Sequence, residues 1–209
     1  MSNVATKPDT NGLRRFKPYP AYKESGVEWL GRIPAQWEIA PLFTVARELD
    51  VRNSGGKETN VLSLSYGQIV RRDVSDNFGL MPESFDTYQI VSADNIVLRL
   101  TDLQNDKKSL RVGLVEERGI ITSAYVALQV RGKIAPKYAF YLLHAYDITK
   151  VFYTLGGGVR QTMKFEDLKW IPILVPKEAE QHTVSVFLDR ETMKIDKLIA
   201  KKERLIELL

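Results

Sequence analysis

The chain has 209 residues, of which 44% are hydrophobic, and this is enough for one well-buried domain with an appendage. It contains no cysteine, which excludes a disulfide framework, a thiolate zinc site and a cysteine nucleophile. Lys and Arg number 30 against 26 Asp and Glu, and the net charge of +4 permits a nucleic-acid partner but does not establish one. The lack of cysteine also fits a reducing compartment, so we expect a cytoplasmic protein. No apolar run reaches the length of a membrane span and the N-terminus has no hydrophobic signal core, so we expect no membrane association.

The N-terminal part of the chain changes character near residue 18. Residues 1–18 are polar and contain prolines and a glycine, which is typical of a flexible lead-in. Residues 19–34 are rich in aromatic side chains and are interrupted by proline and glycine, so we predict an irregular strap pinned by Trp29 and Trp37. A proline is tolerated at the first position of a helix, and one directly precedes a predicted short helix over residues 42–49.

The middle of the chain has the pattern of a sheet with helices packed on it. Short runs of β-branched and aromatic residues, bounded by turn residues, predict strands of a twisted, partly closed sheet at 61–66, 88–91, 95–100 and 124–130. Pro136 opens a predicted helix over 137–146, whose many apolar positions indicate packing on that sheet. A turn of helix is predicted at 165–170, and the prolines in 171–176 confine this run to an edge strand.

The last 32 residues have an unbroken helical pattern, and from 178 to 209 such a helix would be roughly 48 Å long. Its apolar residues are spaced as in the seam of a coiled coil. They are Val184, Leu188, Ile195, Leu198, Leu205 and Leu209, with Ile199 widening the stripe. Polar residues at two further seam positions, Glu191 and Lys202, weaken a pairing while fixing its register and partner. The alternative is an amphipathic helix packed on its own domain.

Together these elements predict an α+β fold in three parts. Residues 1–18 form the lead-in, residues 19–176 a globular β-rich domain with packed helices, and residues 177–209 a long C-terminal coiled-coil helix that serves as a spacer and in dimerisation. We find no internal repeat.

Catalytic constellations are missing from the sequence. The two histidines, His144 and His182, lack metal-ligand spacing, so we expect packing or surface roles and no bound metal. Residues 167–169 (Asp-Leu-Lys) match half of a metal-dependent nuclease signature, but this spacing is short and common. An enzyme in its own right is therefore the least favoured class.

Three polar clusters are candidates for DNA contact. Arginine can make bidentate bonds to guanine and glutamine to adenine, while clustered cations attract phosphate. The candidates are Gly157, Gly158, Arg160 and Gln161 in a glycine-rich loop, Tyr66, Gln68, Arg71 and Arg72 at the end of a strand, and Lys107, Lys108 and Arg111 in a polar loop. For any one of these residues taken alone, a solvated loop charge is the more common explanation, and the three clusters together add modest support for DNA contact.

Both ends of the chain resemble a known family. Residues 22–38 resemble the opening of a specificity subunit of a type I restriction-modification system. Further matches lie at 158–161, 168–176, 180–181, 187–189, 195–199 and 208–209. The segment from about 50 to 150 carries little that matches, and this is where the family varies its target recognition.

The resemblance implies a target recognition domain that reads one half of a split double-stranded DNA sequence, followed by a helix that sets the gap and offers a surface to the modification (methyltransferase) subunit. This chain would itself be non-catalytic and would hold no cofactor. By the same resemblance, the methyltransferase subunit would use S-adenosylmethionine to methylate adenine, and the restriction (motor-nuclease) subunit would use ATP and Mg²⁺.

The chain departs from the family in one respect. Typical members carry two recognition domains and two antiparallel helices, whereas this chain contains one of each, as a half-length subunit or a fragment would. The seam then lacks a partner within the chain, so we predict a homodimer through residues 178–209 that reads an inverted repeat with a fixed spacer. The alternative function is a coiled-coil adaptor that binds only protein.

Overall fold

The computed structural model describes residues 17–72, 84–103, 110–155 and 162–208. The chain divides into two compact units, Met1–Gln36 and Trp37–Leu209. The sequence placed the start of the globular domain at residue 19, whereas residues 19–36 fall within the first unit. The described helices include none that is long and apolar enough to cross a membrane.

The first unit contains a β-hairpin where the sequence predicted an irregular strap. Strands β1 (Tyr22–Glu24) and β2 (Arg32–Pro34) pair antiparallel, with Lys23 opposite Ile33. Arg32 places its guanidinium 5.6 Å from the centroid of the Tyr22 ring, a cation–π contact that joins the two strands. Trp29 is 43% exposed, so it is not the buried anchor that the sequence suggested.

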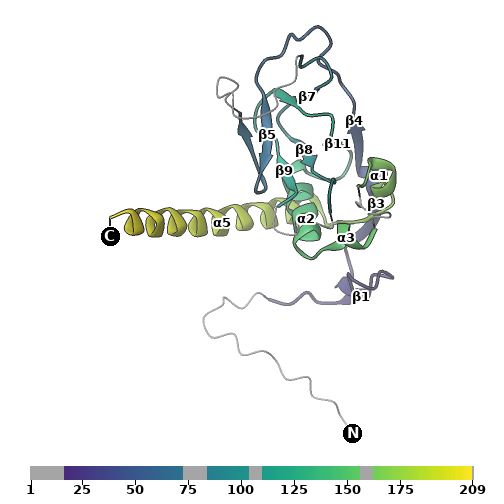
Figure 1. Cartoon of the computed structure of the whole chain (residues 1–209). Helices are drawn as coiled ribbons and strands as arrows, with labels where there is room; N and C mark the ends of the chain where they lie inside the picture. The colour runs from purple at the N-terminus through teal and green to yellow at the C-terminus, as the bar shows by residue number, and fades with distance from the viewer. Residues whose placement is uncertain (1–16, 73–83, 104–109, 156–161, 209) are drawn as a thin grey trace. The chain divides into compact units, whose positions relative to one another are not determined.

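The second unit is built around a four-stranded antiparallel sheet, in the order β4-β11-β8-β9, with three further strand pairs, β7 with β10, β3 with β12 and β5 with β6 (Figure 1). The strands are β3 (Glu38–Pro41), β4 (Ala46–Leu49), β5 (Leu62–Ser65), β6 (Gln68–Arg71), β7 (Gln89–Val91), β8 (Asn95–Leu98), β9 (Val112–Leu114), β10 (Gly119–Ile121), β11 (Val126–Val130) and β12 (Pro172–Val175).

The helices of the second unit are α1 (Leu42–Val45), α2 (Pro136–Ile148), α3 (Val151–Leu155), α4 (Phe165–Leu168) and α5 (Glu178–Glu207). Helix α2 begins at Pro136, as the sequence predicted, and it contacts β8, β9 and the start of α5. Helix α5 is the 30-residue helix that ends the described chain and is drawn in yellow in Figure 1.

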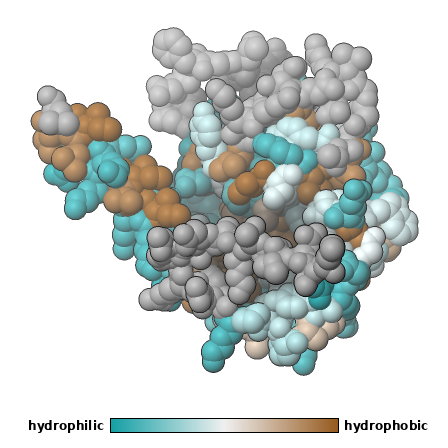
Figure 2. All heavy atoms as spheres, turned by 90° about the horizontal axis from the view of Figure 1, so that it is seen from below, coloured by the Kyte–Doolittle hydropathy of each residue, from teal (hydrophilic) through white to brown (hydrophobic). Residues whose placement is uncertain are grey.

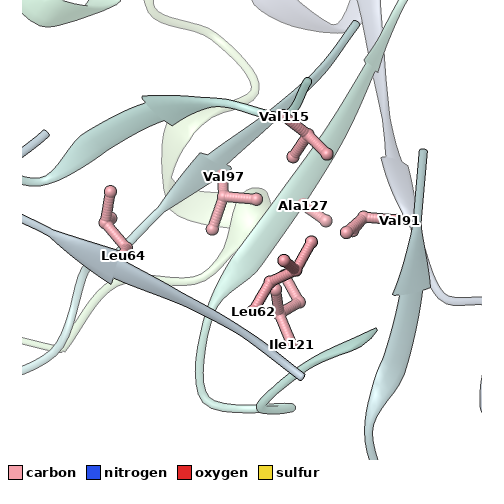
Figure 3. Close-up of a cluster of buried hydrophobic side chains, with 7 residues drawn as sticks. All are labelled: Leu62, Leu64, Val91, Val97, Val115, Ile121 and Ala127. Carbon is pink, nitrogen blue, oxygen red and sulfur yellow. The ribbon is translucent and has the colours of Figure 1, made fainter. Parts of the chain in front are cut away.

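The two faces of the four-stranded sheet bury different apolar clusters because side chains alternate along each strand. On one face, Ile96 of β8 and Leu128 of β11 lie with Leu143 of α2 and Ile173 of β12. The opposite face packs against the β5–β6 hairpin and against β7 and β10. Figure 3 shows this second cluster, which consists of Leu62, Leu64, Val91, Val97, Val115, Ile121 and Ala127. The β5–β6 hairpin is therefore fixed to the sheet by the inward side of β5.

Two glycines allow this hairpin to lie close to its neighbours. A Cβ on Gly113 of β9 would lie 2.6 Å from Cδ1 of Leu64 and 2.8 Å from Cδ1 of Ile69. A Cβ on Gly119 of β10 would lie 2.5 Å from the backbone oxygen of Asn60, just before β5. A side chain at Gly119 would displace the backbone that leads into the hairpin, and one at Gly113 would displace the side chains of Leu64 and Ile69.

Most predicted elements are confirmed, and the differences have local causes. The four predicted strands correspond to β5, β7, β8 and β11, and the predicted edge strand is β12, which pairs with β3. The predicted helix over 42–49 is wrong in its second half, where Ala46–Leu49 forms β4. Pairing of β4 with β11, in which Glu48 lies opposite Leu128, overrides the local helical pattern there.

Candidate nucleic-acid interface

The β5–β6 hairpin carries three of the predicted DNA-contacting side chains, Tyr66 and Gln68 at its tip and Arg71 at the end of β6. Ser65 pairs with Gln68, which leaves Tyr66 and Gly67 as a two-residue turn with φ of 46° and 82°. Positive φ at both positions is the type I′ geometry that suits the twist of a hairpin, and glycine adopts it freely. Tyr66 is 75% exposed and Gln68 is exposed, so both side chains are available to a ligand.

The tip of this hairpin is seated on the domain. A Cβ on Gly67 would lie 3.2 Å from Cβ of Leu110 and 3.6 Å from Cε1 of His144, a residue of α2. Burial lowers the pKa of His144, whose ring faces the tip, although the charge of Asp147 opposes that shift. Leu110 and His144 thus lie against the backbone of the turn at Gly67.

Arg71, the last residue of β6, and Arg72, which follows it, differ in how available their side chains are to a ligand. Arg71 makes a bidentate ion pair with Glu117, through Nε to Oε1 at 2.6 Å and through its Nη2 to Oε2. This hydrogen-bonded pairing raises the pKa of Arg71 and lowers that of Glu117. Arg72 is exposed, and its backbone N–H donates to the oxygen of Val61 at 2.8 Å. The side chain of Arg72 is therefore better placed than that of Arg71 to attract a phosphate.

Arg111 is buried, and its prediction as a DNA contact is wrong. Its exposed fraction is 0%, because the guanidinium donates to the carbonyl oxygens of Arg99, Thr101 and Asp102 at 2.9–3.2 Å. Its Nε also donates to the hydroxyl of Tyr153 in α3 at 3.1 Å. The side chain therefore ties residues 99–102 and α3 to the start of β9 inside the protein.

Asp147 of α2 completes this buried arrangement. Its Oδ2 accepts a 2.7 Å hydrogen bond from the backbone N–H of Arg111, and the residue is 1% exposed. Burial raises the pKa of Asp147, although the bond from Arg111 and the charge of Lys150 oppose that rise. The pair connects α2 to the segment that enters β9.

The remaining predicted DNA contacts, Gly157, Gly158, Arg160, Gln161, Lys107 and Lys108, lie outside the described residues. The described residues on either side of these two segments lie near one another. The backbone N–H of Met163 donates to the oxygen of Leu100 at 2.9 Å, and Arg111 bonds to the oxygen of Asp102. Leu110 faces Gly67 at the hairpin tip. The described residues that flank these two segments thus lie in one region of the domain, which includes the hairpin tip.

The predicted seam of α5 has two parts with different surroundings. Val184 and Leu188 are half-buried, on the part of α5 that packs on α2. From Thr192 to Leu208 every residue is exposed, and the apolar side chains are 49–57% exposed at Ile195, Leu198, Ile199 and Leu205. Leu209 lies outside the described residues. Apolar side chains gather along this part of α5 in Figure 2. Packing of α5 on its own domain therefore explains the apolar residues of its first turns only.

Sequence reasoning gave no role to two polar residues of α5, Gln181 and Asp189. Gln181 is 1% exposed, and Asp189 bonds to Tyr141 of α2 at 2.7 Å. Gln181 lies three residues before Val184 and seven before Leu188, so it occupies a seam position. A polar residue in line with an apolar stripe is the signal that would have found it.

The residues that resembled half of a nuclease signature have structural roles. The Asp167 carboxylate accepts a 2.8 Å hydrogen bond from the backbone N–H of Lys164 and so caps the start of α4. Lys169 forms an ion pair with Glu166. Among the described residues no group of three or more histidines, cysteines and carboxylates is placed to hold a metal ion.

No family model and no curated protein matches this sequence. Solved structures do match. One is a chain from work on complex assembly and conformational transition of the type I R-M system, with a TM-score of 0.54 and 17% identity over 85% of this chain and 42% of that chain. Another is the HsdS subunit from Thermoanaerobacter tengcongensis, with a TM-score of 0.52 and 14% identity over 85% of this chain and 41% of that one.

A third is the type I restriction-modification S subunit from M. genitalium, with a TM-score of 0.52 and 15% identity over 78% of this chain and 41% of that chain. The chain thus spans about two fifths of the length of these neighbours. It has the α+β fold of part of an S subunit, with the long α5 after the β-rich domain.

Proposed function

We propose that this chain is a DNA sequence-specificity subunit of a type I restriction-modification complex, which reads one half of a bipartite target and docks the methyltransferase subunit. The observation that carries the proposal is the S-subunit fold, which covers 85% of this chain, and the two main parts of the chain are the β-rich domain and α5. A fold alone does not assign a function, so the proposal depends also on the surfaces of these two parts.

The candidate reading surface is centred on the β5–β6 hairpin. Tyr66 and Gln68 are exposed on a hairpin that is fixed to the sheet, and Arg72 follows with an exposed side chain. Glutamine can recognise adenine through two hydrogen bonds, and an exposed arginine contributes phosphate affinity. We propose that Arg160 and Gln161 add base contacts and that Lys107 and Lys108 add phosphate contacts.

The exposed part of α5 supports a homodimer. From residue 192 to residue 207 it is roughly 24 Å long, and its apolar stripe is uncovered within the described chain. A second copy of the same stripe is its simplest cover, because a twofold dimer buries the same surface on both subunits. The two reading domains would then recognise an inverted repeat with a fixed spacer.

The chemistry would be carried out by partner subunits. In this proposal the methyltransferase subunit binds S-adenosylmethionine and methylates adenine, and the restriction subunit uses ATP and Mg²⁺. The present chain would contribute sequence recognition and the geometry of the complex, without a catalytic group of its own.

The test is co-expression with the methyltransferase subunit encoded beside it, followed by single-molecule sequencing that maps methylated adenines. A split, inverted-repeat motif is the expected result. A split asymmetric motif would mean that a second, different specificity half completes the reader and that the homodimer is not the functional state. A stable complex without new methylation would overturn the proposal.

The second candidate is a protein-only adaptor, which the burial of Arg111 and the pairing of Arg71 favour by removing two cations from the reading surface. Salt-dependent, sequence-selective DNA binding separates the two functions. In a DNA reader, Arg160→Ala should relax specificity, whereas replacement of Lys107 and Lys108 should mainly reduce the slope of affinity against salt.

A further inference from the structure

Gln181 attaches the start of α5 to the globular domain by its side chain. Its Oε1 accepts a 2.8 Å hydrogen bond from the N–H of Ala135, and its Nε2 donates to the oxygens of Lys133 and Pro176 at 2.8 and 2.9 Å. The amide is buried, and each of these bonds has a defined direction. Rotation or sliding of α5 would therefore leave buried polar groups without partners, which is costly.

Asp189 makes a second attachment two turns later. Its Oδ1 accepts a 2.7 Å hydrogen bond from the hydroxyl of Tyr141, and its Oδ2 lies 2.7 Å from Nζ of Lys137. Both partners belong to α2. Between the two attachments, Ser185 is 5% exposed on the same side of α5 and donates to the oxygen of Gln181 in its own helix. A small side chain here lets α5 approach the domain closely.

Two separate attachments restrain the tilt of a helix, whereas one allows it to pivot. Gln181 and Asp189 are eight residues apart, or about 12 Å along the helix axis. The preceding connection is also short, because β12 ends at Val175 and α5 begins at Glu178 after a single proline and Lys177. Helix α5 is therefore held in one direction before its exposed part begins.

We propose that Gln181 and Asp189 are positioning residues that fix the direction of α5 relative to the reading domain and thereby set the number of base pairs between the two half-sites. This inference rests on the proposed function for its second part. The two side chains form a polar clamp on one end of the spacer, and the exposed seam at the other end determines which partner helix it meets.

The geometry makes spacing sensitive to this clamp. From Asp189 to Glu207 the helix is about 27 Å long, so a tilt of about 7° moves its far end by roughly 3.4 Å, the rise of one base pair. A loosened clamp should therefore permit spacers that differ by one base pair. The bases recognised within each half-site should not change, because the clamp lies outside the β5–β6 hairpin.

The first test measures the clamp without DNA. The chain has no cysteine, so Glu116→Cys in the domain and Lys201→Cys on α5 can carry two spin labels, with unlabelled chains in excess to remove distances between subunits. Both positions are exposed. Pulsed electron paramagnetic resonance should give a narrow distance distribution for the parent and one at least twice as broad for Gln181→Met combined with Asp189→Ala.

Two further variants make this result specific. Thr183→Ala changes an exposed hydroxyl of the same helical turn that bonds only within α5, to Ala179, and should leave the distribution unchanged. Tyr141→Phe preserves packing but removes one bond to Asp189, so it should broaden the distribution to a smaller extent even where the double variant fails to fold. Distance distributions of equal width in the parent, the Tyr141→Phe variant and the double variant would overturn the clamp.

The second test measures spacing with the methyltransferase complex on synthetic targets whose spacers differ by single base pairs. The parent should favour one spacer by at least tenfold, and the double variant should methylate neighbouring spacers within threefold while it reads the same half-sites. An unchanged spacer preference in the double variant would overturn the second part of the inference. Absence of any methylation by the parent would instead refute the proposed function, and the distance measurement would still decide the clamp.

Discussion

The Nε of Arg111 donates to the hydroxyl of Tyr153 at 3.1 Å, and this bond joins the residue before β9 to the short helix α3. The same guanidinium holds the carbonyl oxygens of Arg99, Thr101 and Asp102. One buried cation thus joins Asp102 and Tyr153, which lie shortly before the segments that contain Lys107, Lys108, Arg160 and Gln161. Arg111 therefore has a structural role inside the domain, in place of the DNA contact that was predicted.

Replacement of Arg111 should therefore reduce stability. Arg111→Met keeps much of the side-chain volume but leaves buried carbonyl oxygens without donors, so we expect the free energy of unfolding to fall by about 3 kcal/mol. Urea denaturation followed by circular dichroism measures this. Arg72→Met, on the surface, is the matched control and should change the value by less than about 0.5 kcal/mol. Equal stability of the two variants would contradict the structural role of Arg111.

The contact between α2 and α5 should weaken at both ends of the pH scale. Burial alone would raise the pKa of Asp189, but hydrogen bonds from Lys137 and Tyr141 lower it below the ordinary range. The stability from this carboxylate is therefore present above its unfolded-state pKa and is lost as pH falls through the lower folded-state value. Burial and the bond to Asp189 raise the pKa of Tyr141 to about 12. This neutral hydroxyl stabilises the fold below pH 10, and the contribution is lost as pH rises towards 12.

The measurement is the free energy of unfolding across pH, compared between the parent and Tyr141→Phe. The difference between them should shrink above pH 10, because the phenylalanine variant has no proton to lose there. Burial also raises the pKa of Tyr146, which both proteins retain, so its titration cancels in the comparison. A difference that stays constant from pH 8 to pH 11.5 would show that Tyr141 does not titrate with folding.

The fold was predictable where local patterns and tertiary pairing agree. Apolar runs between turn residues located β5, β7, β8 and β11, and Pro136 marked the start of α2. Local pattern failed at Ala46–Leu49, where pairing with β11 makes a strand of a helical sequence. It also failed for β9 and β10, which are three residues each and contain Gly113 and Gly119. These strands pair with β8 and β7, and their glycines permit close packing of the hairpin, neither of which periodicity reports.

The candidate site was only partly predictable for a related reason. Composition identifies arginines but does not say which are buried. Arg71, Arg72 and Arg111 were indistinguishable in the sequence, yet they are paired, exposed and buried, respectively. The seam of α5 was visible from its spacing. The point at which α5 leaves the domain, after Asp189, depends on contacts with α2 that come from residues about 50 positions earlier.

The exposed part of α5 should control the oligomeric state. Ile195→Asp combined with Leu198→Asp places charge in the apolar stripe on both subunits of a dimer. Burial of one such side chain contributes about 1.5–3 kcal/mol. We therefore expect the dissociation constant of the dimer to rise at least a hundredfold, which corresponds to a loss of about 2.7 kcal/mol of dimerisation free energy. Sedimentation equilibrium should show monomers at concentrations where the parent is dimeric.

The control for this experiment lies on the opposite side of the helix. Lys197→Asp combined with Arg204→Asp introduces the same side chains about half a turn away from the stripe. This variant should remain a dimer. An unchanged molar mass in the variant with Ile195→Asp and Leu198→Asp would refute the proposed homodimer interface. Loss of the dimer in both variants would mean that net charge, rather than the stripe, determines association.

Arg71 and Arg72 are neighbours in sequence and should contribute differently to DNA binding. Arg72 is exposed, so Arg72→Ala should weaken binding to all sequences and reduce the slope of log affinity against log salt by about 1. Glu117 already neutralises Arg71, so Arg71→Ala should change the salt slope less than Arg72→Ala does. The same substitution leaves the Glu117 carboxylate unpaired, and its repulsion of the DNA phosphates should still lower the affinity. Fluorescence anisotropy at several salt concentrations, with the methyltransferase subunit present, separates the slope from the intercept. Equal slopes for the two variants would show that the ion pair with Glu117 opens when DNA binds.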